Sequence, residues 1–140
     1  MIVLDTNVLS ELMRRRPNPR VLGWLDREDA RGLFVTAVSE AEIRTGLGLL
    51  PDGRRRWELT AAADRVFDEA FRGRVLPFDA AAARVYAEIT SERRAAGRPI
   101  SQFDCQIAAI ARSRGMGVAT RDVEGFAGCG VEVIDPWAAS

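Results

Sequence analysis

Four carboxylates lie at positions where a protein of alternating strands and helices commonly has its functional residues. Asp5 and Asp122 each follow a short apolar run with the composition of a buried strand. Glu42 and Asp104 lie near the starts of two segments with helical periodicity. Ligand sites of parallel α/β sheets lie off the carboxyl ends of the strands. We therefore expect the four acids to meet at one edge of one sheet.

Four converging carboxylates would repel one another, and a divalent cation compensates them best. Mg²⁺ prefers oxygen ligands, keeps several waters and is held by one or two direct carboxylates, and Mn²⁺ suits the same ligands. Such a cation lowers the pKa of a bound water and stabilises charge on a phosphoryl oxygen. The reaction class that fits is phosphodiester hydrolysis.

The composition removes most rival chemistries. The sequence has no histidine, and all twenty of its basic residues are arginine. Ser-His-Asp and Cys-His catalysis, a Walker lysine and a Schiff-base lysine are therefore excluded. The two cysteines, Cys105 and Cys129, cannot form a zinc site alone or a disulfide framework, and Cys105 is expected to be a buried, reduced thiol.

Each acid also has a purely structural interpretation. Ser39-x-x-Glu42 matches a helix capping box, and Ser101-x-x-Asp104 resembles one with aspartate in place of glutamate. Asp122 could cap a short helix that follows it. Asp5 is the hardest to explain structurally, because ending a buried strand on a carboxylate is costly without a partner.

The order of apolar runs, turn residues and helix-capping residues predicts alternating strands and helices. Strands are expected at residues 2–4, 33–35, 75–76 and 117–119, with an edge strand at 131–134. Helices are expected at 7–15, from 18–19, at 38–50 and 54–71, from 79 to about 96, and from 101 to about 114. This alternation predicts a three-layer α/β/α fold with a mostly parallel sheet of four to five strands.

Length and composition favour one domain over residues 1–140. The chain is 47% hydrophobic and 29% charged, which suits a single core with a solvated surface. No segment approaches the roughly 20 apolar residues of a membrane span, so we expect a cytoplasmic protein. The net charge is zero, but arginines cluster locally, and the groups at 14–20 and 93–98 are candidates for phosphate contacts.

Several strings, taken in order, resemble a known family. LDTN at 4–7, SEAEIRTG at 39–46, FDCQIAAIA at 103–111 and ATRD at 119–122 resemble the PIN domain. More narrowly, MIVLDTNVLSEL at 1–12, VLPFD at 75–79 and DPW at 135–137 resemble VapC-type toxins, including the FitB-like branch. The resemblance extends over the whole chain.

The resemblance implies a metal-dependent ribonuclease. The acidic cluster of the family maps by motif onto four residues, which would hold Mg²⁺ or Mn²⁺: Asp5, Glu42, Asp104 and Asp122. The neighbouring polar positions map onto Thr6, Asn7 and Thr120, of which the last two would orient acids or waters. Cys105 stands where relatives commonly carry a small or apolar residue, and we expect it to affect packing only.

The resemblance also implies partners. Such toxins form homodimers and are neutralised by an antitoxin whose N-terminal part binds DNA, so that DNA is reached only through the antitoxin. The antitoxin's C-terminal tail would occupy the groove near the acids. RNA is the implied substrate, and no membrane is involved.

Alternatives stay open at this point. An aspartyl phosphatase would need an acid where Asn7 stands, and commonly a lysine. A phospho-receiver domain likewise lacks its lysine. A non-catalytic subunit that regulates DNA through a bound antitoxin remains possible, as does a metal-dependent nuclease acting on single-stranded DNA.

Overall fold

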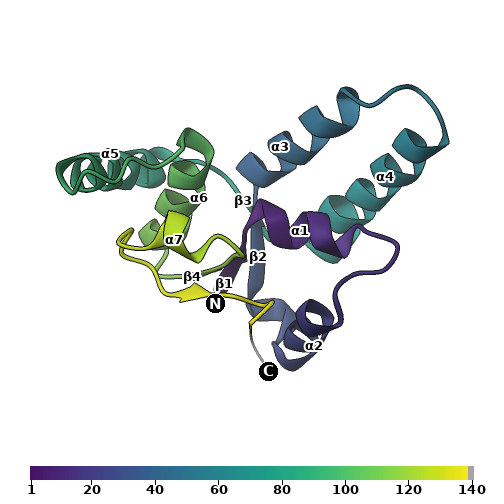
Figure 1. Cartoon of the computed structure of the whole chain (residues 1–140), viewed down its shortest axis with the longest axis horizontal. Helices are drawn as coiled ribbons and strands as arrows, with labels where there is room; N and C mark the ends of the chain where they lie inside the picture. The colour runs from purple at the N-terminus through teal and green to yellow at the C-terminus, as the bar shows by residue number, and fades with distance from the viewer. Residues whose placement is uncertain (139–140) are drawn as a thin grey trace.

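The computed structural model describes residues 1–138, which form one parallel five-stranded sheet flanked by helices (Figure 1). The strand order is β3-β2-β1-β4-β5, and every neighbouring pair is parallel. The strands are β1 (Ile2–Leu4), β2 (Leu33–Thr36), β3 (Val75–Leu76), β4 (Gly117–Ala119) and β5 (Val133–Ile134). The predicted three-layer α/β/α architecture is confirmed.

Helices cover both faces of the sheet. One face carries α5 (Ala80–Ala95), α6 (Gln102–Ser113) and α7 (Val123–Phe126). The other carries α1 (Thr6–Leu12), α2 (Pro19–Arg27) and α4 (Arg54–Asp64), with the short segments η1 (Ala30–Gly32) and η2 (Arg65–Ala70). Helix α3 (Ala37–Gly48) contributes to both faces and projects beyond the sheet beside α4 (Figure 1). Among residues 1–138, no helix has the length and apolar character needed to span a bilayer.

The strands bury both of their faces, which explains their continuous apolar runs. Val3 and Val118 are register partners and pack with α5 and α6. Leu4 and Ala119, one residue further along, are also partners and pack on the opposite side with α1 and α2. Because side chains alternate along a strand, two separate cores form on one sheet.

Local capping signals place the helix starts where the sequence predicts them. Asn18 Oδ1 accepts a hydrogen bond from the Arg20 amide at 2.9 Å, and Asp79 Oδ1 accepts one from Ala82 at 3.0 Å. Ser101 caps α6. These caps satisfy helix amides that have no partner within the helix.

The predicted helix at 54–71 differs in its second half. Regular α-helix ends at Asp64, and η2 continues as a wider π-type segment. The amide of Phe71 donates to the carbonyl of Val66 at 2.9 Å, five residues back, which closes this wider turn. The predicted edge strand is likewise shorter, at Val133–Ile134.

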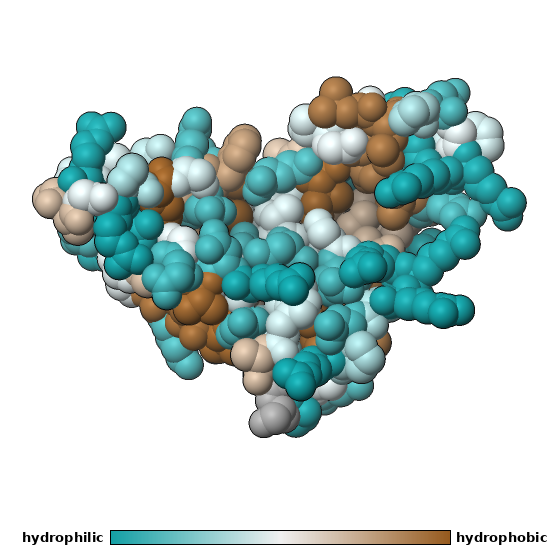
Figure 2. Space-filling view, in the orientation of Figure 1, coloured by the Kyte–Doolittle hydropathy of each residue, from teal (hydrophilic) through white to brown (hydrophobic). Residues whose placement is uncertain are grey.

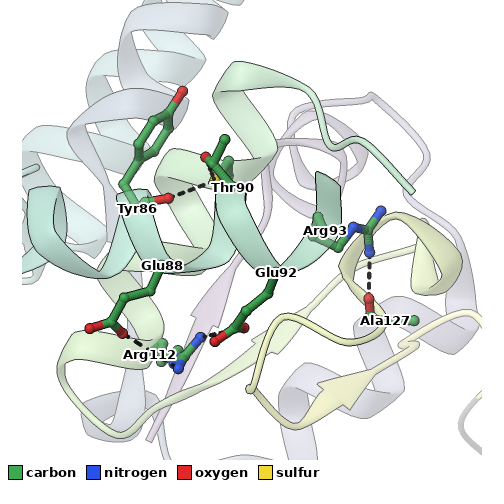
Figure 3. Close-up of polar contacts among 8 residues, drawn as sticks. Tyr86, Glu88, Thr90, Glu92, Arg93, Arg112 and Ala127 are labelled. Carbon is green, nitrogen blue, oxygen red and sulfur yellow. Dashed lines mark hydrogen bonds and ion pairs between the residues drawn. The ribbon is translucent and has the colours of Figure 1, made fainter. Parts of the chain in front are cut away.

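Helix α6 is fixed firmly against α5 (Figure 3). Arg112 of α6 forms ion pairs with Glu88 and Glu92 of α5, at 3.6 and 3.3 Å. Cys105 is buried, and its sulfur lies 3.5 Å from the Thr90 hydroxyl. The cysteine therefore packs between the two helices as a reduced thiol, and α6 is fixed to α5 near both of its ends.

Candidate active site

Asp5 is the first residue after β1 and the N-cap of α1. One carboxylate oxygen accepts from the amide of Thr6 at 2.8 Å, and the other accepts from the Thr120 hydroxyl at 2.8 Å. The side chain is only 4% exposed. Asp5 thus has a capping role, but one amide and one hydroxyl are few partners for a buried carboxylate.

The hydroxyl of Thr120 joins three parts of the site. Its single proton is donated to Asp5, so its lone pairs accept from the Asn7 side-chain amide at 3.2 Å and from the Asp122 backbone amide at 3.0 Å. The other end of the Asn7 side chain accepts from the backbone amide of Arg121 at 3.3 Å. Thr120 and Asn7 therefore tie the end of β1 to the end of β4 and fix the orientation of the Asp5 carboxylate.

Glu42 reaches the same edge from the second turn of α3. Its Oε1 accepts a hydrogen bond from the Thr6 hydroxyl at 2.8 Å. The hydroxyl of Ser39 lies 2.8 Å from that of Thr6 and must donate to it, because the only Thr6 proton is used on Glu42. The capping-box interpretation of Ser39 and Glu42 is wrong, since the N-cap of α3 is Thr36, three residues earlier.

Asp104 lies in the first turn of α6, as the sequence predicts. Its backbone amide donates to the Ser101 hydroxyl at 3.2 Å, which is one half of the predicted capping box. That bond uses the backbone of Asp104, whose half-buried side chain lines the pocket described below and has Ser101 as a further polar neighbour. The short connection from α6 to β4 makes the helix run antiparallel to the strand and brings its start to the carboxyl edge.

Asp122 differs from the other three acids. It is exposed, and its Oδ1 caps α7 by accepting from the Gly125 amide at 3.1 Å. A Cβ at position 125 would lie 2.2 Å from Oδ2 of Asp122, so this cap requires glycine there. Asp122 is nevertheless near enough to Asp104 to raise the pKa of that carboxyl.

The other three acids line one pocket of about 660 Å³, which we call the acid pocket. Its lining residues include Asp5, Glu42 and Asp104, together with Thr6 and Asn7. They come from β1–α1, α3 and α6, which are far apart in the sequence and meet at the carboxyl ends of β1, β2 and β4. Thr120 is connected to this pocket by its hydrogen bond to Asp5, and Asp122 by its hydrogen bond to Thr120.

The carboxyl groups of Asp5 and Asp104 have raised pKa values. Burial raises the pKa of Asp5 from 3.8 to about 6, the charges of Asp104 and Glu42 add to the increase, and the bonds from Thr120 and Thr6 oppose it. Burial and the charge of Asp122 also raise the pKa of Asp104. A raised carboxyl pKa means that this protein alone compensates the negative charges incompletely.

The donor set fits a hard divalent cation. The acid groups and the hydroxyls of Thr6 and Ser10 all offer oxygen, which Mg²⁺ and Mn²⁺ prefer. Within residues 1–138, no three acids or thiols already converge around one point as a closed cage would require. A cation that keeps most of its waters needs only one or two direct carboxylates, so the open arrangement suits it.

The pocket is also lined by residues that are not among the predicted site residues, namely Ser10, Glu11, Arg55, Arg121 and Trp137. Arg121 and Trp137 both line the acid pocket, and the Arg121 guanidinium lies 5.2 Å from the centre of the Trp137 ring. Of the predicted phosphate-binding clusters, Arg14 lines the pocket, whereas Arg93 is buried elsewhere. Arg121 belongs to the motif ATRD, but its contact with Trp137 depends on a residue outside that motif.

Comparison with known proteins agrees with this geometry. Residues 2–128 match the family model described as PIN domain. The chain belongs to the PIN-domain family. It is 42% identical to the VapC ribonuclease Y4jK of Sinorhizobium fredii, over 98% of each chain, and 40% identical to the toxin FitB of Neisseria gonorrhoeae, over 98% of this chain and 99% of that one. The predicted resemblance to VapC-type and FitB-like PIN proteins is confirmed.

Solved structures agree as well. A structure of FitAB bound to an IR36 DNA fragment matches with a TM-score of 0.92 and 40% identity, covering 100% of this chain and 98% of that chain. The crystal structure of FitAcB from Neisseria gonorrhoeae matches with a TM-score of 0.87 and 38% identity, over 99% of each chain. This PIN domain therefore has the fold of FitB-like proteins throughout its described length.

Proposed function

We propose that this PIN-domain protein is the toxin of a toxin–antitoxin pair and hydrolyses RNA with a divalent cation held in the acid pocket. The observation that carries the proposal is the buried Asp5, which faces Glu42 and Asp104 and has a pKa raised to about 6. An uncompensated buried charge costs stability, so its retention points to a ligand that supplies the missing positive charge.

The residues of the pocket have distinct roles in this proposal. Asp5, Glu42 and Asp104 would hold the cation through their carboxylate oxygens. Thr120 and Asn7 fix the Asp5 carboxylate through the bonds described above. The bound Mg²⁺ or Mn²⁺ supplies a water of lowered pKa and neutralises charge on the phosphoryl oxygen. Asp122 acts from a distance, by its charge on Asp104 and its bond to Thr120.

RNA is the substrate suggested by the relatives. A protein 42% identical to this chain is named a VapC ribonuclease, and it spans the same length. Arg14, Arg55 and Arg121 line the acid pocket beside the carboxylates, and they can contact backbone phosphates. A phosphodiester could thus lie with its reacting phosphate at the acids and its neighbouring phosphates at the arginines.

A second hollow suits the proposed antitoxin. We call it the arginine groove: it measures about 1040 Å³ and runs between the end of α1 and the helix α4. Its floor is apolar, with Leu12, Leu59 and Val66, and Figure 2 shows apolar side chains in a hollow framed by hydrophilic ones. Arg14 and Arg55 line both this groove and the acid pocket, so the two are continuous.

This continuity supports the partner assignment. An extended antitoxin tail with apolar and acidic side chains could fill the arginine groove and reach the acid pocket, which would block RNA. The relatives of known structure include FitAB bound to a DNA fragment. We therefore propose an antitoxin with a DNA-binding N-terminal part, a toxin homodimer, and DNA contact only through the antitoxin.

The direct test is metal-dependent cleavage by the purified protein. We expect degradation of single-stranded RNA in Mg²⁺ or Mn²⁺, loss of that activity in EDTA, and recovery when the metal is restored. A matched single-stranded DNA distinguishes a ribonuclease from a nuclease of broader substrate range. A well-folded protein that cleaves neither nucleic acid with either metal would leave the non-catalytic subunit as the better interpretation.

A further inference from the structure

The rim of the acid pocket carries an arginine that is held in place by an aromatic ring. Arg121 follows Thr120 at the end of β4, its side chain is exposed, and it lines the pocket together with Asp5 and Asp104. Its guanidinium lies 5.2 Å from the centre of the Trp137 ring. Both partners line the pocket, so this contact lies at the mouth of the site.

Trp137 is held in place by its own contacts. Its ring packs against the core on the α1–α2 side of the sheet. Its amide donates to Asp135 Oδ1 at 2.9 Å, and its carbonyl accepts from Arg20 at 3.4 Å. Three separate contacts thus fix the segment that places the indole under the guanidinium.

The backbone of Arg121 is fixed as well. Its amide donates to Oδ1 of Asn7, the residue whose other side-chain atom bonds to Thr120. The base of the side chain is therefore anchored to the same network that orients Asp5. Fixing both ends of a long side chain reduces the conformational entropy that binding would otherwise cost.

The arginines of the pocket differ in what they are paired with. Arg14 forms an ion pair with Glu11 at 3.3 Å, which uses part of its charge. Among residues 1–138, no carboxylate forms an ion pair with Arg55 or Arg121, and of these two only Arg121 lies over an aromatic ring. The guanidinium of Arg121 lies over the indole ring, a contact that uses none of its five N–H donors. This geometry suits an anion that lies beside the acids.

We propose that Arg121, held over the Trp137 ring, binds a backbone phosphate of single-stranded RNA next to the reacting phosphodiester. Trp137 is then a positioning residue that acts through Arg121. The inference rests on the proposed ribonuclease function and adds the contact that places the substrate. It also explains why the motif ATRD contains a cation between two residues that serve the acids.

The test measures binding separately from cleavage. A short fluorescein-labelled single-stranded RNA of mixed sequence is titrated with the full-length protein in EDTA, by fluorescence anisotropy over a series of salt concentrations. Arg121→Gln is expected to weaken binding about tenfold, as the loss of a charge-assisted bond would. The slope of log affinity against log salt should also fall by about 0.7, the value for one phosphate on a single strand.

Trp137→Leu keeps an apolar side chain but removes the aromatic face. It should weaken binding by a few-fold, about the worth of a cation–π contact, and keep the wild-type salt slope, because the charge is still present. It should have no further effect in the Arg121→Gln background, since the ring acts only through the arginine. Trp137→Phe should restore most of the binding, and thermal melting checks that each variant folds.

Arg84→Gln is the matched control, because it removes one exposed charge from α5, away from the pocket. Wild-type RNA binding by Arg121→Gln, in a protein whose wild type binds and cleaves RNA, would overturn the inference and leave the proposed function standing. A full effect of Trp137→Leu in the Arg121→Gln background would overturn the positioning role. A wild type that neither binds nor cleaves RNA in Mg²⁺ would remove both proposals.

Discussion

Two buried charged side chains in this protein are compensated in opposite ways. Arg93, at the end of α5, is 7% exposed, and its guanidinium donates to the backbone carbonyls of Arg98 and Ala127. Figure 3 shows the contact with Ala127. Asp5, at the end of β1, is 4% exposed and accepts two hydrogen bonds, but it faces other carboxylates. The first charge is satisfied by the chain itself, and the second is left in excess.

The contrast separates a structural charge from a functional one. Arg93 ties the loop before α6 to the end of α7, so its burial holds the corner of the fold together. The repulsion around Asp5 does not stabilise the fold. It lowers the free energy of unfolding when the carboxyl group is ionised, above about pH 6. Removing the charge should therefore cost stability at Arg93 and activity at the acid pocket.

The largest effect is expected at Asp104. Asp104→Asn keeps the size of the side chain and the backbone bond to Ser101 but removes a negative charge from the proposed cation site. Single-turnover RNA cleavage in Mg²⁺ should fall about a hundredfold or more, on the order of 3 kcal/mol in transition-state stabilisation. The free energy of unfolding in urea should hold or rise. Normal cleavage with a loss of stability would show that Asp104 serves only as a cap.

The opposite result is expected at Arg93. Arg93→Met retains the bulk of the stem but leaves the carbonyls of Arg98 and Ala127 without their donor. The free energy of unfolding should fall by about 2–4 kcal/mol, while the folded protein keeps its cleavage rate. The neighbour Arg94 is exposed, and Arg94→Met should change stability by less than about 0.5 kcal/mol. Equal stability of the two variants would contradict the structural role.

The pH dependence of stability distinguishes the same two kinds of charge. The folded pKa of Asp5 is about 6, above its ordinary value of 3.8. Its contribution to stability is therefore fully present below about pH 4 and is lost as the pH rises through 6. In EDTA, Asp5→Asn should gain stability over wild type across this window, by about 3 kcal/mol at most. Urea unfolding at a series of pH values measures the difference, and a constant difference would contradict the raised pKa.

A smaller effect is expected at Asp122, which caps α7 and acts on the pocket only from a distance. Asp122→Asn keeps a good capping side chain, so stability should stay within about 0.5 kcal/mol of wild type. RNA cleavage should fall by about tenfold or less, since the charge reaches the site only through Asp104. A loss as large as that of Asp104→Asn would place Asp122 among the residues that hold the cation.

The sequence predicts what local signals and strand order determine. The caps at Asn18, Asp79 and Ser101 follow from side chains that bond to amides two or three residues away, so the string alone contains them. The placement of Asp5 and Asp104 at one edge follows from parallel strands and a short connection. For the caps, the physical cause lies within three residues of its effect.

The features that the sequence misses depend on distant partners. Ser39 resembles an N-cap, but β2 continues to Thr36, which pairs with Leu76 of β3 and caps α3 instead. Arg93 belongs to an Arg-Arg pair, a pattern typical of a solvated surface. Its burial depends on backbone carbonyls that belong to other segments. Arg121 precedes β5 in the sequence and Trp137 follows it, so no local sequence pattern predicts their contact.

The central claim is that the excess negative charge at Asp5 is kept for a divalent cation that acts on RNA. The most direct measurement is the rate of RNA cleavage by purified Asp5→Asn in Mg²⁺, beside the wild type and after unfolding curves show that both fold. We expect the variant to lose cleavage while matching or exceeding the stability of the wild type. A folded Asp5→Asn protein that cleaves RNA as fast as the wild type would contradict the account.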